Sequence, residues 1–180
     1  IAQERLAKLS SDDIDAIIEF THPSSFWKNM DGLLTTGIPV ITGTTGWYDR
    51  MDELASIVEQ KQAALMYAAN FSVGVNVMFK LNRELARLMN RYPEYDPYIE
   101  EQHHHYKADA PSGTGIALGQ EIIDALDRKS SIATDALQAR PPESDELSIG
   151  YVRAGGIIGK HTVGYTSEID SITLTHEAYN

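Results

Sequence analysis

The chain has 180 residues and a formal net charge of -11, with 26 acidic against 15 basic side chains. This balance disfavours nucleic-acid binding, which needs a basic face, and the absence of cysteine excludes disulfides and thiolate chemistry. No apolar run approaches the roughly 20 residues that cross a bilayer, so we expect no membrane insertion and a cytoplasmic location.

The first lobe, residues 1–71, alternates short apolar runs with amphipathic stretches, which is typical of a parallel α/β sheet. The nearly continuous apolar run Ala16–Phe20 predicts a strand that is covered on both faces. Ser24 or Ser25 is expected to cap the helix that follows, and Gly37 to end it in the left-handed conformation. Strands are predicted at residues 16–20, 40–42 and 64–68.

The second lobe, residues 72–180, begins with a long helix that Ser72 can cap. Its apolar residues recur at helical spacing as Val73, Val77, Leu81, Leu85 and Leu88. A second helix over residues 116–126 precedes a polar, proline-containing loop that reaches Glu146. Three β-rich runs then predict an antiparallel or mixed sheet. These runs are residues 149–153, 157–165 and 169–174. The fold class is α/β, a parallel-sheet lobe followed by an α+β lobe.

Ligands of open parallel sheets bind beyond the carboxyl ends of the strands, where this chain has three loops. In Gly43–Gly46 the glycines let a ligand approach the backbone, and the threonine hydroxyls can bind ribose, amide or phosphate groups. Taken alone, this loop is more often plain turn chemistry, and without a following Lys-Ser/Thr pair it is not a P-loop. Asn70 and Phe71 can place an amide and an aromatic face beside a flat cofactor ring, although Phe71 could equally be a core residue.

The segment Glu101–Thr114, EQHHHYKADAPSGT, concentrates proton donors in an otherwise acidic protein. Histidine exchanges protons near neutral pH, and Lys107 offers a cation, which suits a reaction that binds carboxylates and delivers a proton. Residues 111–114 then begin a helix whose first amide groups form an anion site. A carboxylate could rest there beside Lys107.

Two alternatives compete with this interpretation of the histidines. One is a zinc site, but in an extended segment His103 and His105 share one side while His104 faces the other, so the three cannot readily meet one tetrahedral ion. We therefore expect no metal. The other is a solvated loop without chemistry, which the adjoining start of a helix disfavours.

The spacing Glu-x-His-His-x-x-Lys-x-Asp-Ala-Pro-Ser-Gly-Thr, complete at residues 101–114, resembles the signature of the dihydrodipicolinate reductase family. The resemblance extends through Glu19–Thr21, Gly43–Gly46, Ala69–Asn76 and Arg153–His161, and so covers most of the chain.

The resemblance implies a Rossmann-like lobe over residues 1–71 that binds a nicotinamide dinucleotide, and a substrate-binding and tetramerisation lobe over residues 72–180. The implied reaction is the reduction of 4-hydroxy-tetrahydrodipicolinate, with loss of water, to tetrahydrodipicolinate in lysine and diaminopimelate biosynthesis. The implied cofactor is NADH or NADPH, the substrate is a small dicarboxylate, and the assembly is a homotetramer.

The resemblance also implies roles by position. His103 matches the family's proton donor, His104 a substrate contact, and Lys107 a second proton-donating or charge-stabilising residue. The groups implied to hold a substrate carboxylate belong to Ser112, Gly113 and Thr114. The implied cofactor-binding residues are Gly43, Thr44, Thr45, Ala68, Ala69, Asn70 and Phe71.

Family members begin with a strand and a Gly-x-x-Gly-x-Met turn that binds pyrophosphate, and they continue beyond the position of Asn180. Both segments lie outside these 180 residues, so we expect the chain to be part of a longer polypeptide. The competing functions are another small dehydrogenase of similar architecture, a non-catalytic ligand-binding module and a zinc hydrolase. The first of these would not need the His-His-x-x-Lys to Pro-Ser-Gly-Thr arrangement.

Overall fold

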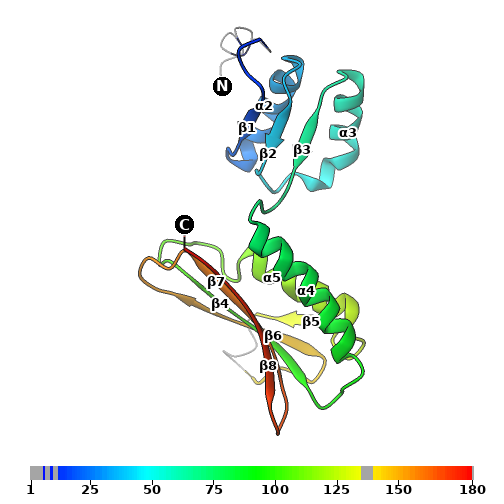
Figure 1. Cartoon of the computed structure of the whole chain (residues 1–180), viewed down its shortest axis with the longest axis vertical. Helices are drawn as coiled ribbons and strands as arrows, with labels where there is room; N and C mark the ends of the chain where they lie inside the picture. The colour runs from blue at the N-terminus through cyan, green and yellow to red at the C-terminus, as the bar shows by residue number, and fades with distance from the viewer. Residues whose placement is uncertain (1–5, 7–8, 10–11, 135–139, 180) are drawn as a thin grey trace. The chain divides into compact units, whose positions relative to one another are not determined.

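The computed structural model describes residues 6, 9, 12–134 and 140–179 (Figure 1). The chain divides into two compact units, unit 1 from Ile1 to Phe71 and unit 2 from Ser72 to Asn180.

Unit 1 is built on a three-stranded parallel sheet in the order β1-β2-β3. Its elements are β1 (Ile17–Glu19), α2 (Pro23–Thr35), β2 (Val40–Thr42), the 3-10 helix η1 (Tyr48–Arg50), α3 (Met51–Gln60) and β3 (Leu65–Tyr67). Glu19 pairs with Thr42, and Thr42 pairs with Tyr67, so the three strands end level. The loops that follow the strands therefore share one edge of the sheet, and the predicted alternation of strands and helices is confirmed.

Only one face of this sheet is covered by described residues, so the prediction that β1 is covered on both faces is wrong. Ile18 is 71% exposed, Phe20 63% and Met66 57%. The strand order advances in one direction, and right-handed crossovers then place α2 and α3 on the same face. Apolar side chains of β1 and β3 consequently remain open on the other face.

The predicted cap of α2 is also wrong. The helix begins at Pro23, and the side chain of His22 accepts a hydrogen bond from the Ser24 amide at 3.3 Å. Proline suits the first helical position because that position needs no amide donor. Gly37 has a φ of 72°, as predicted for the residue that follows the helix.

Unit 2 packs two helices against a five-stranded mixed sheet in the order β5-β6-β4-β7-β8 (Figure 1). Its elements are α4 (Val73–Met89), β4 (Asp96–His103), α5 (Gly113–Ala125), β5 (Ser131–Ala133), β6 (Glu146–Arg153), β7 (Gly159–Thr166) and β8 (Ser171–Ala178). β4 runs parallel to β6 and antiparallel to β7. The mixed sheet is confirmed, but the short β5 lies inside the stretch that was predicted to be a loop.

Of the apolar series that predicts α4, only Leu85 packs against the core of unit 2. Val73 is 78% exposed and Leu88 58%, whereas Val75, Met78, Asn82, Ala86 and Met89 are buried. The polar side chain of Asn82 can be buried because its amide donates to the Leu118 carbonyl of α5 at 3.0 Å. The helix thus carries apolar residues on two faces, and the hydrogen bond from Asn82 to Leu118 favours packing of the face that contains Asn82.

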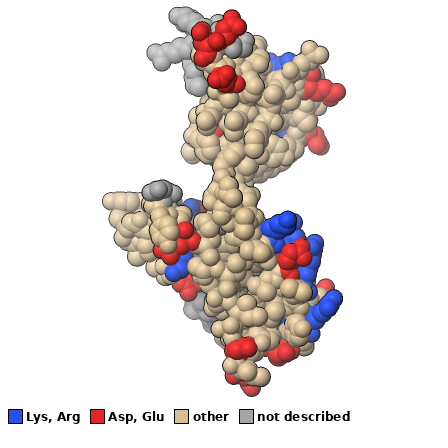
Figure 2. All heavy atoms as spheres, viewed as in Figure 1, with Lys and Arg blue, Asp and Glu red and all other residues tan. Residues whose placement is uncertain are grey.

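The surface charge is dispersed. On the face that Figure 2 shows, acidic side chains are scattered over both units, and basic side chains gather on unit 2. Among the described helices, none is both long enough and apolar enough to span a bilayer.

Candidate active site

The site in unit 2 is positioned by strand β4, along which buried and more exposed residues alternate. Pro97, Ile99, Glu101 and His103 are all buried on the side that faces the helices, while Glu100 between them is exposed. Ile99 of this row belongs to the hydrophobic core, and Glu101 and His103 follow towards the end of the strand. His161 of β7 pairs with Glu101 across the sheet, which brings its imidazole beside the carboxylate. An ionisable cluster therefore lies inside unit 2.

The chain turns directly after His103, so the assumption of an extended histidine segment is wrong. The Lys107 amide bonds to the His104 carbonyl at 3.1 Å, which closes a turn. His105 is exposed, lies 3.7 Å from the Tyr106 ring between centroids, and places Nδ1 3.0 Å from the Gly155 carbonyl oxygen. His104 is half-buried, and its Nδ1 has no hydrogen-bond partner among the described residues. Only His103 of the three enters the buried cluster.

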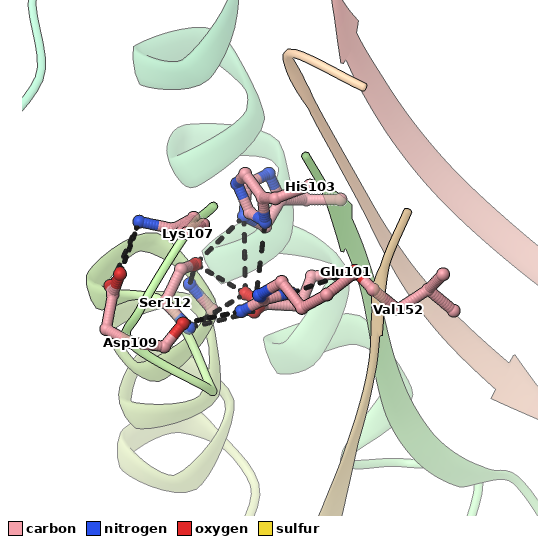
Figure 3. A network of polar contacts seen from close by, with 9 residues as sticks. Glu101, His103, Lys107, Asp109, Ser112 and Val152 are labelled. Atoms are coloured by element: carbon pink, nitrogen blue, oxygen red, sulfur yellow. Dashed lines mark hydrogen bonds and ion pairs between the residues drawn. The ribbon is translucent and has the colours of Figure 1, made fainter. Parts of the chain in front are cut away.

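The start of helix α5 is fastened to Glu101. Ser112 caps the helix by accepting a hydrogen bond from the Gly115 amide at 3.0 Å. The Ser112 amide donates to the two Glu101 oxygens at 2.9 and 3.1 Å, and the Ser112 hydroxyl donates to Oε2 (Figure 3). The loop reaches this position through a cis Ala110–Pro111 peptide bond.

Glu101 is fully buried and ionised. Arg153 donates from Nη2 to Oε1 at 2.6 Å, and Nε2 of His161 lies 3.5 Å from Oε2. Burial by itself would raise the pKa of Glu101, but hydrogen bonds from His161, Ser112 and Arg153 lower it to about 2. The carboxylate is therefore charged throughout the neutral range.

His103 has the opposite character. Burial and the neighbouring His161 lower its pKa to about 4, against a smaller raising effect of the Glu101 charge. The two rings make an edge contact with centroids 5.0 Å apart, and His103 Nδ1 lies 3.9 Å from Glu101 Oε1. His103 is consequently neutral at pH 7 in the free protein.

The remaining predicted residues of unit 2 lie around the start of α5. Lys107 Nζ contacts both oxygens of Asp109, at 2.7 and 3.0 Å (Figure 3). Gly113 is exposed with open space around it, and Thr114 is half-buried. Ser112, by contrast, is buried, and its amide and hydroxyl are already bound to Glu101.

Glu101, His103 and His161 place three potential metal-ligand atoms within 4.8 Å of one another. The Glu101 oxygens, however, already receive hydrogen bonds from Ser112 and from the guanidinium of Arg153. A cation would have to displace these donors and tolerate the arginine charge. The donor set therefore suits a carboxylate held by hydrogen bonds better than a metal ion.

The predicted cofactor loops of unit 1 also meet at one place. The Ala68 amide bonds to the Thr42 carbonyl at 3.2 Å, so the loops after β2 and β3 are neighbours. Thr45 and Ala69 are exposed, Gly43, Ala68 and Asn70 are half-buried, and Thr44 is buried. Phe71 is 39% exposed, and its ring lies 5.8 Å from that of Phe20 between centroids, so it is not a core residue.

A buried carboxylate, Glu19, organises these loops. It accepts hydrogen bonds from the Thr21 amide at 3.0 Å, from the Thr21 hydroxyl and from the Thr42 hydroxyl. Thr42 in turn accepts the Thr44 amide, and Trp47 donates its indole N–H to the Thr44 carbonyl at 2.6 Å. Burial would raise the pKa of Glu19, but the threonine hydrogen bonds lower it overall.

The residues of these networks that were assigned no role from the sequence include Glu19, Glu101, Arg153 and His161. Glu101 could have been found, because it continues the buried alternation of Pro97 and Ile99 two residues before His103. Arg153 and His161 lie at the two ends of a stretch that resembles the family, but no local pattern places them at the cluster, since they reach it from β6 and β7 through sheet pairing.

Comparison with known proteins identifies the family. Residues 1–71 match the family model described as dihydrodipicolinate reductase, N-terminus, and residues 74–180 match dihydrodipicolinate reductase, C-terminus. A curated 4-hydroxy-tetrahydrodipicolinate reductase from Christiangramia forsetii is 39% identical over 170 residues, which are 94% of this chain and 69% of that protein.

Solved structures agree with this result. The dipicolinate-bound dihydrodipicolinate reductase from Paenisporosarcina sp. TG-14 has a TM-score of 0.67 at 28% identity, covering 93% of this chain. The chain spans only 63% of that reductase. The crystal structure of Ari2 has a TM-score of 0.58 at 14% identity, covering 98% of this chain and 50% of that one, which is a likeness of fold alone.

The lowered pKa of His103 predicts a pH-dependent stability. Between the unfolded pKa of 6.5 and the folded pKa of about 4, the unfolded chain binds the extra proton, so the free energy of unfolding falls as pH falls through this window. The loss at pH 4 should be up to about 3 kcal/mol, at about 1.4 kcal/mol for each pH unit. Urea unfolding at pH 7 and pH 4 measures it. His103→Gln should remove most of this loss of unfolding free energy, whereas the exposed control His105→Gln should show the same loss as the wild type. Equal losses in both variants would contradict the lowered pKa of His103.

Proposed function

The chain belongs to the dihydrodipicolinate reductase family, and we propose that the polypeptide containing it reduces 4-hydroxy-tetrahydrodipicolinate to tetrahydrodipicolinate. Members of this family are NAD(P)H-dependent oxidoreductases of lysine and diaminopimelate biosynthesis. The observation that carries the proposal is the folding of the 101–114 signature into one cluster, with His103 beside a buried carboxylate and the start of α5. A cytoplasmic location is proposed with it.

The substrate is a dicarboxylate, and unit 2 offers it two kinds of positive potential. The first amides of α5, at Gly113 and Thr114, form an anion site, where the Gly113 amide here bonds to the Asp109 carboxylate. Lys107 adds a cation, although it is paired with Asp109 here. Such a partly exposed pair is worth about 0–1 kcal/mol, so a substrate carboxylate can replace Asp109. Ser112 stands beside these groups in the proposed carboxylate site, and here its amide and hydroxyl hold the turn to Glu101.

We assign proton donation to His103. Its Nδ1 is buried and faces Glu101, which leaves Nε2 to donate. The imidazole is neutral in the free protein, and a bound dianion favours its charged form, so binding should draw a proton onto it. His104 is assigned to substrate contact, and Lys107 to charge stabilisation.

The loops of unit 1 fit a nicotinamide dinucleotide. They lie at the carboxyl ends of parallel strands, expose Thr45 and Ala69, and present the half-exposed ring of Phe71. We propose that Gly43–Thr45 and Ala68–Phe71 hold NADH or NADPH, which supplies the hydride when bound. Thr44 acts from a buried position, where its amide and hydroxyl are bonded to Thr42 and Thr21.

Assembly into a homotetramer is proposed from the edge of the unit 2 sheet. β8 is an edge strand of eight residues, and an exposed edge of this length invites pairing with another copy. Exposed apolar side chains flank it, with Ile169 91% and Tyr179 81% exposed. Light scattering of the complete polypeptide should give the mass of four chains at micromolar concentration. A stable monomer would contradict this assembly.

Kinetics of the complete polypeptide test the function and the role of His103 together. The wild type should oxidise NADH or NADPH only when the substrate is present. Loss of a positioned general acid costs about 10²- to 10⁴-fold in rate, so His103→Gln should lower turnover by that range and leave cofactor affinity unchanged. The exposed neighbour provides the control: His105→Gln should be nearly silent. Equal damage from the two substitutions would refute the assignment of His103, and an inactive wild type would refute the function.

A further inference from the structure

We propose that Glu101 is a positioning residue, whose ionised carboxylate fixes the start of α5 and thereby aims the Gly113 and Thr114 amides at the substrate. The proposal rests on the proposed function, because it concerns how the dicarboxylate is held. Glu101 itself is 0% exposed, so it cannot touch the substrate and must act through its neighbours.

The first step is the direction of the hydrogen bonds. The Gly115 amide donates to the Ser112 hydroxyl, and that hydroxyl gives its own proton to Glu101 Oε2. His161 Nε2 lies 3.1 Å from the same hydroxyl and 3.5 Å from Oε2, and both of those oxygens act as acceptors for it. Nε2 must therefore carry a proton. Every group that faces the carboxylate is a donor, which only an ionised Glu101 can satisfy.

The second step is the link to the anion site. Both Glu101 oxygens receive the Ser112 amide, so the Pro111–Ser112 peptide unit, one unit before the one that carries the Gly113 amide, has a fixed orientation. The approach is very close, since a Cβ atom at Gly115 would lie 2.6 Å from Oε2. The Gly113 amide bonds to the carboxylate of Asp109, and the Asp109 carbonyl is itself held by Arg153, which also bonds to Glu101. Glu101 thus fixes the direction of the first α5 amides by holding Ser112 at the start of the helix.

The third step is the coupling to two other strands. Arg153 of β6 bonds to Oε1 at 2.6 Å and to the Asp109 carbonyl at 2.7 Å, so it ties the carboxylate to the loop that carries Lys107. His161 of β7 contacts the carboxylate on one side and the ring of His103 on the other. One buried charge therefore joins the anion site, the lysine loop and the proton donor.

The test uses the complete polypeptide, with pyridine-2,6-dicarboxylate as a non-reacting probe in titration calorimetry. Glu101→Gln should weaken binding of the probe by about 10- to 100-fold, the effect of losing hydrogen bonds to a charged group. The Michaelis constant of the substrate should rise in the same proportion, while that of the nicotinamide cofactor should stay within about two-fold. The matched control is Glu100→Gln, which alters the exposed neighbour on the same strand and should bind the probe as the wild type does.

A second variant keeps the test decisive if Glu101→Gln does not fold. Gly115→Ala retains every charge but pushes the carboxylate away from Ser112, and it should weaken the probe in the same direction. A folded variant of either kind that binds the probe within two-fold of the wild type overturns the proposal. If the wild type turns over while that variant is unaffected, only the role of Glu101 fails. If the wild type neither binds the dicarboxylate nor turns over, the proposed function fails with it.

Discussion

The arrangement of unit 2 depends on a buried carboxylate that must remain charged. Taking Glu101 out of water is costly unless every oxygen lone pair finds a donor, and the donors come from three separate segments, Ser112, Arg153 and His161. This requirement draws the start of α5 and strands β6 and β7 towards the end of β4. The site is therefore a consequence of satisfying one charge, with substrate-binding amides and His103 placed around it.

Unit 1 solves a similar problem with different groups. Glu19 ends β1 and is 3% exposed, but the donors that the described residues give it are an amide and hydroxyls of threonine residues rather than a cation. Hydroxyl and amide donors can hold a carboxylate and leave its negative charge uncompensated, whereas Arg153 neutralises Glu101. In both units the loop that carries the implied binding groups is held by hydrogen bonds that involve a buried carboxylate. The implied ligand-binding residues thus depend on acids that the family signature does not single out by role.

Much of this was predictable from the chain. Alternating apolar runs gave the strands and helices of unit 1, and the spacing from Glu101 to Thr114 led to the family. The errors share a cause in tertiary structure. Which face of β1 is covered depends on the direction of the crossovers. The face of α4 that packs depends on the hydrogen bond from Asn82 to α5. The position of His105 depends on a turn that begins directly after His103. Local pattern does not specify these long-range choices, and for the same reason it does not reveal Arg153 or His161.

Glu101 should be ionised and held by donors under the conditions in which the protein binds its ligand. The most direct measurement is a pH titration of the complete polypeptide labelled with 13C at the glutamate side-chain carboxyl groups, with the Glu101 signal assigned by its loss in Glu101→Gln. This signal should stay at the ionised position down to about pH 4, because hydrogen bonds lower the Glu101 pKa to about 2. A signal that titrates near 4.5, the ordinary value of a glutamate, would contradict it.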